Sequence, residues 1–286
     1  MAVRILTDST ADLTPREARD WEVAVVPLGV SFGAGEVYRD GVDLDTAAFY
    51  ARLAEAETLP TTSQPSPELF LAQFEAAQQA GDEVVAVLLS AELSGTVQSA
   101  ELARDLSGWG EHIFIVDSRS VTLGLRLLVQ RAAALRAAGE GAAAIAAALE
   151  EARGRLRLYA VVDTLHYLRK GGRLPGAAAI AGTLLGIKPV IAVSDGRIRL
   201  AGKARGLPGA YVAVFKLITG GDGGIDISAP CAVGYTGHRR AVEPFLQYLT
   251  GALHLPRPAV CAIGAVVGTH AGPGACGIAY FAAASN

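Results

Sequence analysis

Two hydroxyl-rich segments hold the side chains of this chain that are best suited to chemistry. Residues 62–66 read Thr-Ser-Gln-Pro-Ser, and residues 94–99 read Ser-Gly-Thr-Val-Gln-Ser. The second segment follows an apolar run at residues 84–89 and is expected to open a helix. The free N–H groups and the partial positive charge of a helix N-terminus favour an anion. Because no obvious nucleophile-and-base pair lies beside them, we expect this pocket to hold a carboxylate or a phosphate rather than to break a bond.

Helix capping explains only part of this pattern. Ser94 and Thr96 are equally consistent with a simple N-cap, and Ser66 before Pro67 has the same explanation. Capping does not explain three spare hydroxyl donors, Thr61, Thr62 and Ser63. The candidate ligand-binding residues are Thr62, Ser63, Ser94, Gly95, Thr96 and His270.

Residues 258–286 contain no Asp, Glu, Lys or Arg, so His270 is the one side chain there that could carry a charge near neutral pH, and we expect it on a glycine-rich loop. A lone histidine is more often structural than functional. Its imidazole can nevertheless donate a hydrogen bond to a carboxylate. The same segment is apolar enough to resemble a membrane span, but its glycines favour two buried strands joined by a loop.

Catalytic and cofactor sites are weakly supported. A serine-type acyl hydrolase using Ser94 and His270, with Asp117 as third member, is the alternative function, although Ser94 does not lie in a G-x-S-x-G elbow and no Walker A sequence is present. Residues 272–277 match G-x-G-x-x-G but lead into a strand rather than a helix, so we reject a dinucleotide site. Polar residues 8–12 are more typical of caps than of a metal site. We expect no metal and no cofactor.

Basic residues are concentrated in one stretch of the chain. Residues 164–209 contain eight Lys or Arg and a single acid, Asp195, whereas the whole chain has a net charge of −3. A solvated face is the simplest explanation, but so local an imbalance favours a docking surface for a phosphate or an acidic partner. Within it, residues 174–187 are uncharged and predict a buried helix, either plain core or one wall of an apolar tunnel.

Composition narrows the class of protein. With 286 residues, 51% of them hydrophobic, the chain can bury a large core, and its net charge argues against nucleic-acid binding. The mean hydropathy of +0.34 reflects alanine content, or an additional apolar interior such as a tunnel. Three widely spaced cysteines and the absence of a signal-peptide pattern favour reduced thiols and a cytoplasmic location.

Strands alternate with helices in the first half of the chain, which predicts an α/β domain with a parallel sheet. The expected strands are residues 3–7, 23–26, 84–89 and 113–116, and the expected helices are residues 45–56, 68–80, 95–105, 121–138 and 141–153. Ligands bind at the carboxyl ends of such strands. Hydroxyl-rich residues 8–10, 90–96 and 117–120 fall at that edge, and we expect residues 117–118 to cap the helix at 121–138.

The pattern changes in the second half, which predicts an α+β domain with a mixed or antiparallel sheet. The expected strands are residues 158–162, 189–193, 197–201, 232–235, 260–267 and 277–281, and the expected helices are residues 165–170 and 242–253. Residues 194–196 (Ser-Asp-Gly) signal a hairpin. We therefore expect an α/β domain at residues 1–156 and an α+β domain at residues 157–286.

The ordered set of these motifs resembles the DegV family, the fatty-acid-binding proteins that serve bacterial fatty acid kinases. The resemblance covers nearly the whole chain. It rests on residues 7–13 (TDSTADL), 62–66 (TSQPS), 93–99 (LSGTVQS), 117–118 (DS), 169–173 (RKGGR), 186–189 (GIKP) and 270–274 (HAGPG).

This resemblance implies the same two-part fold, with a long-chain fatty acid in a tunnel. Thr62 and Ser94 would bind its carboxylate, and His270 would lie near that head group. The basic face, with Arg169, Arg173, Lys203 and Arg205, would point toward the kinase catalytic subunit. That kinase would supply ATP and transfer the phosphoryl group, so the binding protein would be non-catalytic, would act in phospholipid metabolism and would touch membranes only transiently. The chain departs from the family at residues 206–209 (GLPG), where more basic residues are expected.

Overall fold

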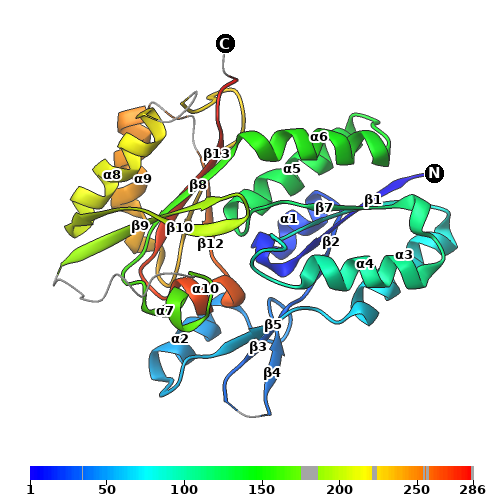
Figure 1. The fold of residues 1–286 in the computed structure, drawn as a ribbon, viewed down its shortest axis with the longest axis horizontal. Helices are drawn as coiled ribbons and strands as arrows, with labels where there is room; N and C mark the ends of the chain where they lie inside the picture. Colours follow the sequence, from blue (N-terminus) through cyan, green and yellow to red (C-terminus); the bar gives the residue numbers. More distant parts are fainter. Residues whose placement is uncertain (34, 175–185, 221–223, 254, 256–257, 285–286) are drawn as a thin grey trace.

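The first sheet has four parallel strands in the order β2-β1-β6-β7 (Figure 1). A computed structural model describes all residues except 34, 175–185, 221–223, 254, 256–257 and 285–286. The strands are β1 (Val3–Asp8), β2 (Val23–Val26), β6 (Glu83–Leu88) and β7 (Ile113–Asp117). All four were predicted, because parallel strands buried on both faces read as continuous apolar runs.

Helices cover both faces of this sheet. Alternate side chains of β6 point to opposite sides: Val84, Ala86 and Leu88 pack in one cluster, and Val85 and Val87 in another. The first cluster includes residues of α3 (Pro67–Ala80) and α4 (Thr96–Ser107), and the second includes residues of α5 (Leu123–Ala137) and α6 (Ala142–Arg155). The short helices η1 (Ser9–Ala11), α1 (Pro15–Asp20) and η2 (Gly110–His112) complete this half.

The second sheet is mixed and has six strands in the order β10-β9-β8-β13-β11-β12. They are β8 (Leu156–Val161), β9 (Ile187–Ser194), β10 (Arg197–Arg205), β11 (Ala232–Tyr235), β12 (Ala259–Ala262) and β13 (Cys276–Phe281). Among the strand pairs that the described residues form in this sheet, β11–β12 is parallel and the others are antiparallel. Helices α8 (Gly206–Gly220) and α9 (Glu243–Leu253) pack on one face, whereas α5 contacts this sheet as well as the first (Figure 1). Helix α7 (His166–Lys170) follows β8, and η4 (Arg239–Ala241) precedes α9.

The sequence did not predict the third sheet, which has the order β4-β3-β5. Its strands are β3 (Gly29–Ser31), β4 (Val37–Arg39) and β5 (Thr61–Ser63), and α2 (Thr46–Glu55) follows β4. Strands of three residues are too short to show an alternating pattern. Its importance is that β5 holds the first hydroxyl-rich segment in an extended conformation.

Two predictions about secondary structure are wrong, one about a strand and one about a helix cap. Residues 260–267 do not form one strand: β12 ends at Ala262, and α10 (Ala265–Ala271) follows with Gly264 as its N-cap. Asp117 and Ser118 do not cap α5, whose N-cap is Thr122; Asp117 instead accepts from the backbone N–H of Arg119. Helix α8 was missed.

Other expectations on the second half have mixed outcomes. Most of the predicted helix at residues 174–187 lies outside the described residues, while Ile187 begins β9. The fold class is confirmed, and the division into domains at residues 156 and 157 stays a prediction. Among the described residues, no helix is both long and apolar enough to cross a membrane.

Candidate functional site

A cavity of about 300 Å³ lies between the first and second sheets. Its walls are mostly aliphatic and come from both halves of the chain, with Leu89 and Val121 on one side and Leu158, Ile191 and Val193 on the other. The chain leaves β1 toward β2 and leaves β6 toward β7 in the opposite direction. Such a switch point in a parallel sheet is where ligands bind. The cavity is thus an apolar space at the expected edge of the sheet.

Polar groups gather along part of the lining. Thr62, Ser63 and Gln64 reach the cavity from β5 and the residue after it, and Ser94 and Gly95 reach it from the start of α4. The two segments are held together, since a Cβ on Gly95 would lie 2.1 Å from the Gln64 Oε1 atom. Gln64 also donates to Ser99 Oγ at 2.8 Å. The structure therefore brings both hydroxyl-rich segments together, as the sequence predicted.

Thr62 is hydrogen-bonded to His270, with 2.9 Å between Oγ1 and Nε2. Burial, with a smaller contribution from the charge of Arg173, lowers the pKa of His270 to about 4, so the imidazole is neutral at neutral pH. Its buried Nδ1 has no hydrogen-bond partner within the described part of the chain and faces Gly171, where a Cβ would lie 2.1 Å away. We assign the ring hydrogen to Nε2, because this tautomer leaves no N–H unpaired. The Thr62 hydroxyl then accepts from His270 and keeps its own hydrogen for a ligand.

His270 therefore sits in the last turn of α10, not on the expected glycine-rich loop. Val266, Val267 and Ala271 of the same helix line the apolar wall. One short helix thus supplies both a polar group and part of the hydrocarbon surface of the cavity.

Arg173 also lines the cavity. Its Nη1 donates to the carbonyl oxygen of Gly171 at 2.7 Å, and its Nε donates to that of Leu93 at 3.2 Å. Burial lowers the pKa of its guanidinium. Sequence reasoning placed Arg173 on an outward basic face, because a run of cations indicates a surface. The structure places this charge where it can act on an anion in the cavity.

Ser94 and His270 line the same cavity but are not hydrogen-bonded to each other in the described residues. The Ser94 hydroxyl lies 2.9 Å from Thr96 Oγ1, and Thr96 is itself buried outside the lining. Asp117 is engaged with backbone N–H groups of Ala91 and Arg119. The arrangement required for a proton relay from serine to histidine to aspartate is therefore not formed.

Known proteins share both the sequence and this architecture. The family model described as "Uncharacterised protein, DegV family" matches residues 2–283. The chain belongs to the DegV family. A "DegV domain-containing protein" of Deinococcus radiodurans is 39% identical over 282 residues, covering 98% of each chain.

Solved DegV structures add the ligand class of the relatives. The structure described as "Fatty Acid Binding of a DegV family Protein from Thermus thermophilus" has a TM-score of 0.88 at 35% identity, covering 99% of this chain and 100% of that chain. A stearic acid-binding protein from Eubacterium ventriosum has a TM-score of 0.87 at 27% identity, covering 99% and 98%. The DegV neighbours of this chain thus include fatty-acid-binding proteins.

The remaining residues of the predicted basic face do not line the cavity. Arg169, Lys203 and Arg205 are exposed, and the last two lie two residues apart on β10. Thr10 and Thr122 are polar lining residues that sequence reasoning did not select. Thr10 follows a predicted strand, which was the available signal, whereas Thr122 reaches the cavity through a positive φ of 47° that no local pattern shows.

Proposed function

We propose that this protein binds a long-chain fatty acid, with its carboxylate at the polar lining and its acyl chain along the aliphatic walls. The observation that carries the proposal is the pairing of an apolar cavity with Thr62, His270 and Arg173 on one part of its lining. The fatty acids bound by DegV neighbours support it.

Each polar group has a role in this proposal. The Thr62 hydroxyl donates to one carboxylate oxygen, while neutral His270 orients that hydroxyl by donating to it. Ser94 and the start of α4 offer further donors, and Arg173 supplies the balancing charge from a partly desolvated position, where a charge-assisted hydrogen bond is strong. Ser63 and Gly95 shape this end, and Thr96 orients Ser94.

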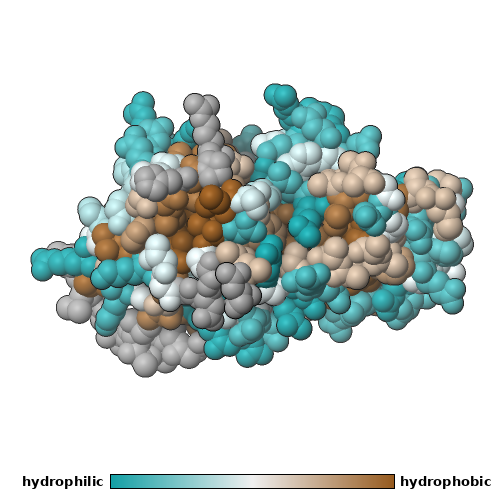
Figure 2. Space-filling view, turned by 90° about the horizontal axis from the view of Figure 1, so that it is seen from above, coloured by the Kyte–Doolittle hydropathy of each residue, from teal (hydrophilic) through white to brown (hydrophobic). Residues whose placement is uncertain are grey.

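We propose further that the protein is a non-catalytic carrier in the cytoplasm that presents its fatty acid to the catalytic subunit of a fatty acid kinase. The exposed cations Arg169, Lys203 and Arg205 would meet that subunit. Hydrophobic side chains gather at the surface over the half that holds the second sheet (Figure 2). Exposed Leu207 and Val212 on α8 would permit transient contact with a membrane surface.

Mass spectrometry of the purified protein, native and after solvent extraction, tests the binding proposal. We expect a stoichiometric long-chain fatty acid that is lost or weakened in Thr62→Ala and Ser94→Ala. Thr61→Ala is the matched control, because Thr61 is an exposed residue of the same strand β5 that does not line the cavity. A protein that is empty and also fails to bind added fatty acid would refute the proposal.

The same protein tests the hydrolase alternative and the kinase partner. Ester turnover that disappears in Ser94→Ala would establish a hydrolase, but the geometry does not favour it. For the partner, Lys203→Glu with Arg205→Glu should reduce acyl-phosphate formation by an added fatty acid kinase and ATP. Arg131→Glu, an exposed position on α5, should leave it unchanged.

A further inference from the structure

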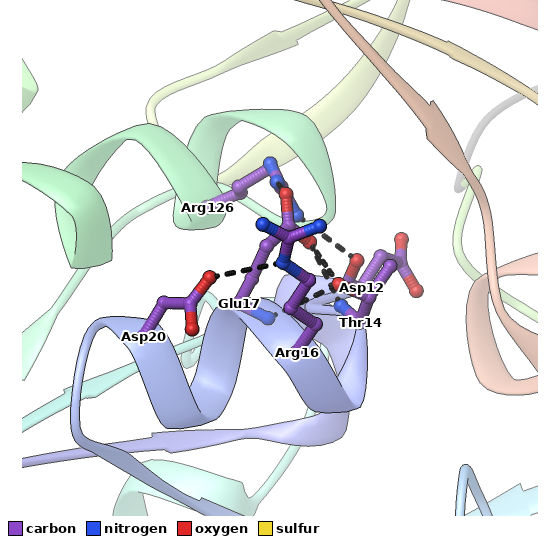
Figure 3. Close-up of polar contacts among 6 residues, drawn as sticks. All are labelled: Asp12, Thr14, Arg16, Glu17, Asp20 and Arg126. Carbon is purple, nitrogen blue, oxygen red and sulfur yellow. Dashed lines mark hydrogen bonds and ion pairs between the residues drawn. The ribbon is translucent and has the colours of Figure 1, made fainter.

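A second cavity, of about 440 Å³, lies at the N-terminal end of α10 and is lined by ionisable groups that the proposed function does not use. Among them are Asp12, Asp40, Glu17 and Arg126. Figure 3 shows the side of this cluster formed by α1 and α5, where Arg126 pairs with Glu17 and donates to the carbonyl oxygen of Asp12 at 3.1 Å. Through its backbone carbonyl, Asp12 is therefore tied to the ion pair of Arg126 and Glu17.

Two aspartates from outside α10 accept the first backbone N–H groups of that helix. Asp12 Oδ1 accepts from Gly264 N at 2.8 Å, and Asp40 Oδ1 accepts from Ala265 N at 3.2 Å. A Cβ on Gly264 would lie 2.8 Å from Asp12 Oδ1 and 3.5 Å from Asp40 Oδ1. Glycine at this position thus allows both carboxyl groups to approach the helix end.

The same helix also lines the first cavity, the acyl cavity, in which the fatty acid is proposed to bind. From N-cap to last turn, α10 joins the two aspartates to the His270–Thr62 hydrogen bond. Its register against α2 is fixed, because a Cβ on Gly268 would lie 2.5 Å from the Tyr50 hydroxyl oxygen, and Tyr50 donates to the carbonyl oxygen of Ile263 at 3.0 Å. A shift of the N-terminal end would therefore be transmitted along the helix to His270.

A second connection runs through Thr122. This residue lines the acyl cavity and donates to Asp12 Oδ2 at 2.5 Å. Asp12 thus holds two separate parts of the cavity wall, the start of α5 and the start of α10.

We propose that Asp12 and Asp40 are positioning residues of the fatty-acid site: they hold α10 so that His270 stays bonded to Thr62. The inference rests on the proposed function. Neither aspartate lines the cavity that holds Thr62 and His270, so each acts through the helix.

The test compares fatty-acid affinity across folded variants of the whole chain, with palmitate as the probe. We expect Asp12→Ala and Asp40→Ala each to weaken binding roughly tenfold, the ratio that corresponds to loss of the single Thr62–His270 hydrogen bond at the site. Asp12→Asn and Asp40→Asn keep a carbonyl oxygen that can accept from the helix and should restore most of the affinity. Asp82→Ala is the matched control, since Asp82 also accepts backbone and arginine hydrogen bonds but lies away from the cavity.

Two further readouts separate positioning from a general loss of stability. The ¹⁵N signals of the His270 imidazole should shift in the alanine variants and not in Asp82→Ala. In a His270→Ala background, Asp40→Ala should cost little more affinity, because residues that act through one another are not additive.

Unchanged affinity in the alanine variants would overturn this inference but not the proposed function. Full additivity of their affinity losses with that of His270→Ala would do the same. Failure of the wild-type protein to bind palmitate would overturn the proposed function together with it.

If an alanine variant does not fold, Gly264→Ala provides the test. The φ of −71° at Gly264 suits alanine, so the added methyl acts only by separating the helix from Asp12. Weaker binding is expected, and wild-type affinity would overturn the inference.

Discussion

At the scale of single residues, the polar lining joins a neutral imidazole to a charged guanidinium. His270 lies on α10 and Arg173 follows α7, and the positive charge of Arg173 is one reason why the pKa of His270 falls to about 4. A neutral imidazole can only donate or accept, so the charge that meets a carboxylate has to come from Arg173. Because Arg173 carries the charge and His270 makes a hydrogen bond, removal of the charge and removal of the hydrogen bond should have separate consequences for binding.

Arg173→Gln tests that division. The variant keeps a hydrogen-bonding side chain but loses the charge, so fatty-acid affinity should fall about tenfold or more, since hydrogen bonds to charged groups are worth about 1.5–3 kcal/mol. The pKa of His270 should rise, yet stay below 6.5, because burial is its larger cause. Calorimetry gives the affinity, and ¹⁵N NMR against pH gives the titration. An unchanged titration of His270 would show that the two groups do not interact.

At the scale of elements, the hairpin of β9 and β10 closes one side of the cavity. Its turn residues Asp195 and Gly196 both have positive φ, 51° and 77°, as a two-residue turn of this hand requires. The tip docks on the loop after β6: Ser90 donates to the carbonyl oxygen of Gly196 at 2.7 Å, and Arg197 pairs with Glu92 at 2.8 Å.

Gly196→Ala should loosen this contact. The backbone strain costs about 1–2 kcal/mol of folding free energy, and the new Cβ would lie 2.5 Å from Ser90 Oγ. Gly81→Ala is the control, because Gly81 has a φ of 69° but nothing within 4 Å of its added Cβ. Urea unfolding should show a larger loss for Gly196→Ala, and fatty-acid affinity should fall in that variant only. If the two variants lost equal unfolding free energy and equal fatty-acid affinity, the hairpin tip would not contribute to the cavity.

The same elements show how far the sequence could be read. Buried strands such as β6 and the turn at Asp195 were predicted, because continuous apolar runs and an Asp-Gly pair are local signals. The start of helix α10 was predicted as the end of a strand and its last turn as a loop, since its valines favour a strand and the aspartates that accept its first N–H groups lie more than 200 residues earlier. The position of Arg173 in the cavity lining could not be predicted for a similar reason, because its contact with Leu93 is also distant in sequence. Both hydroxyl segments were found, but the Thr62–His270 hydrogen bond could not be.

At the scale of the whole molecule, buried acids make stability depend on pH. Burial raises the pKa of Asp12 to about 8, and those of Asp8 and Asp40 to about 6. A raised folded-state pKa means that the native protein holds a proton that the unfolded chain has lost, so stability falls as pH rises through that value. His270 acts in the opposite sense, because its pKa is lowered and stability falls as pH drops from 6.5 toward 4.

Between pH 6.5 and 8, Asp12 is therefore the main source of the slope. We expect the wild-type protein to lose up to ~1.4 kcal/mol of unfolding free energy per pH unit there. Asp12→Asn should flatten this dependence, whereas Asp82→Asn should not, because the pKa of Asp82 is lowered. Urea midpoints at pH 6.5 and pH 8 measure the difference. A slope that survives in Asp12→Asn would place its origin elsewhere.

The cavity between the sheets also predicts how affinity varies with acyl length. Its walls come from β8 and β9 and from residues that follow strands of the first sheet, such as Leu89, so added methylenes are buried against both halves of the molecule. Burial of one methylene contributes about 0.8 kcal/mol, which corresponds to roughly fourfold in affinity. Affinity should rise by this factor per carbon in a series of saturated acids and then stop rising when the cavity is full.

The unfolding temperature should follow the same order at equal ligand concentration, since a ligand that binds only the native state stabilises it in proportion to the logarithm of its affinity. Affinity that does not depend on chain length would mean that only the carboxylate is bound and that the aliphatic walls are ordinary core.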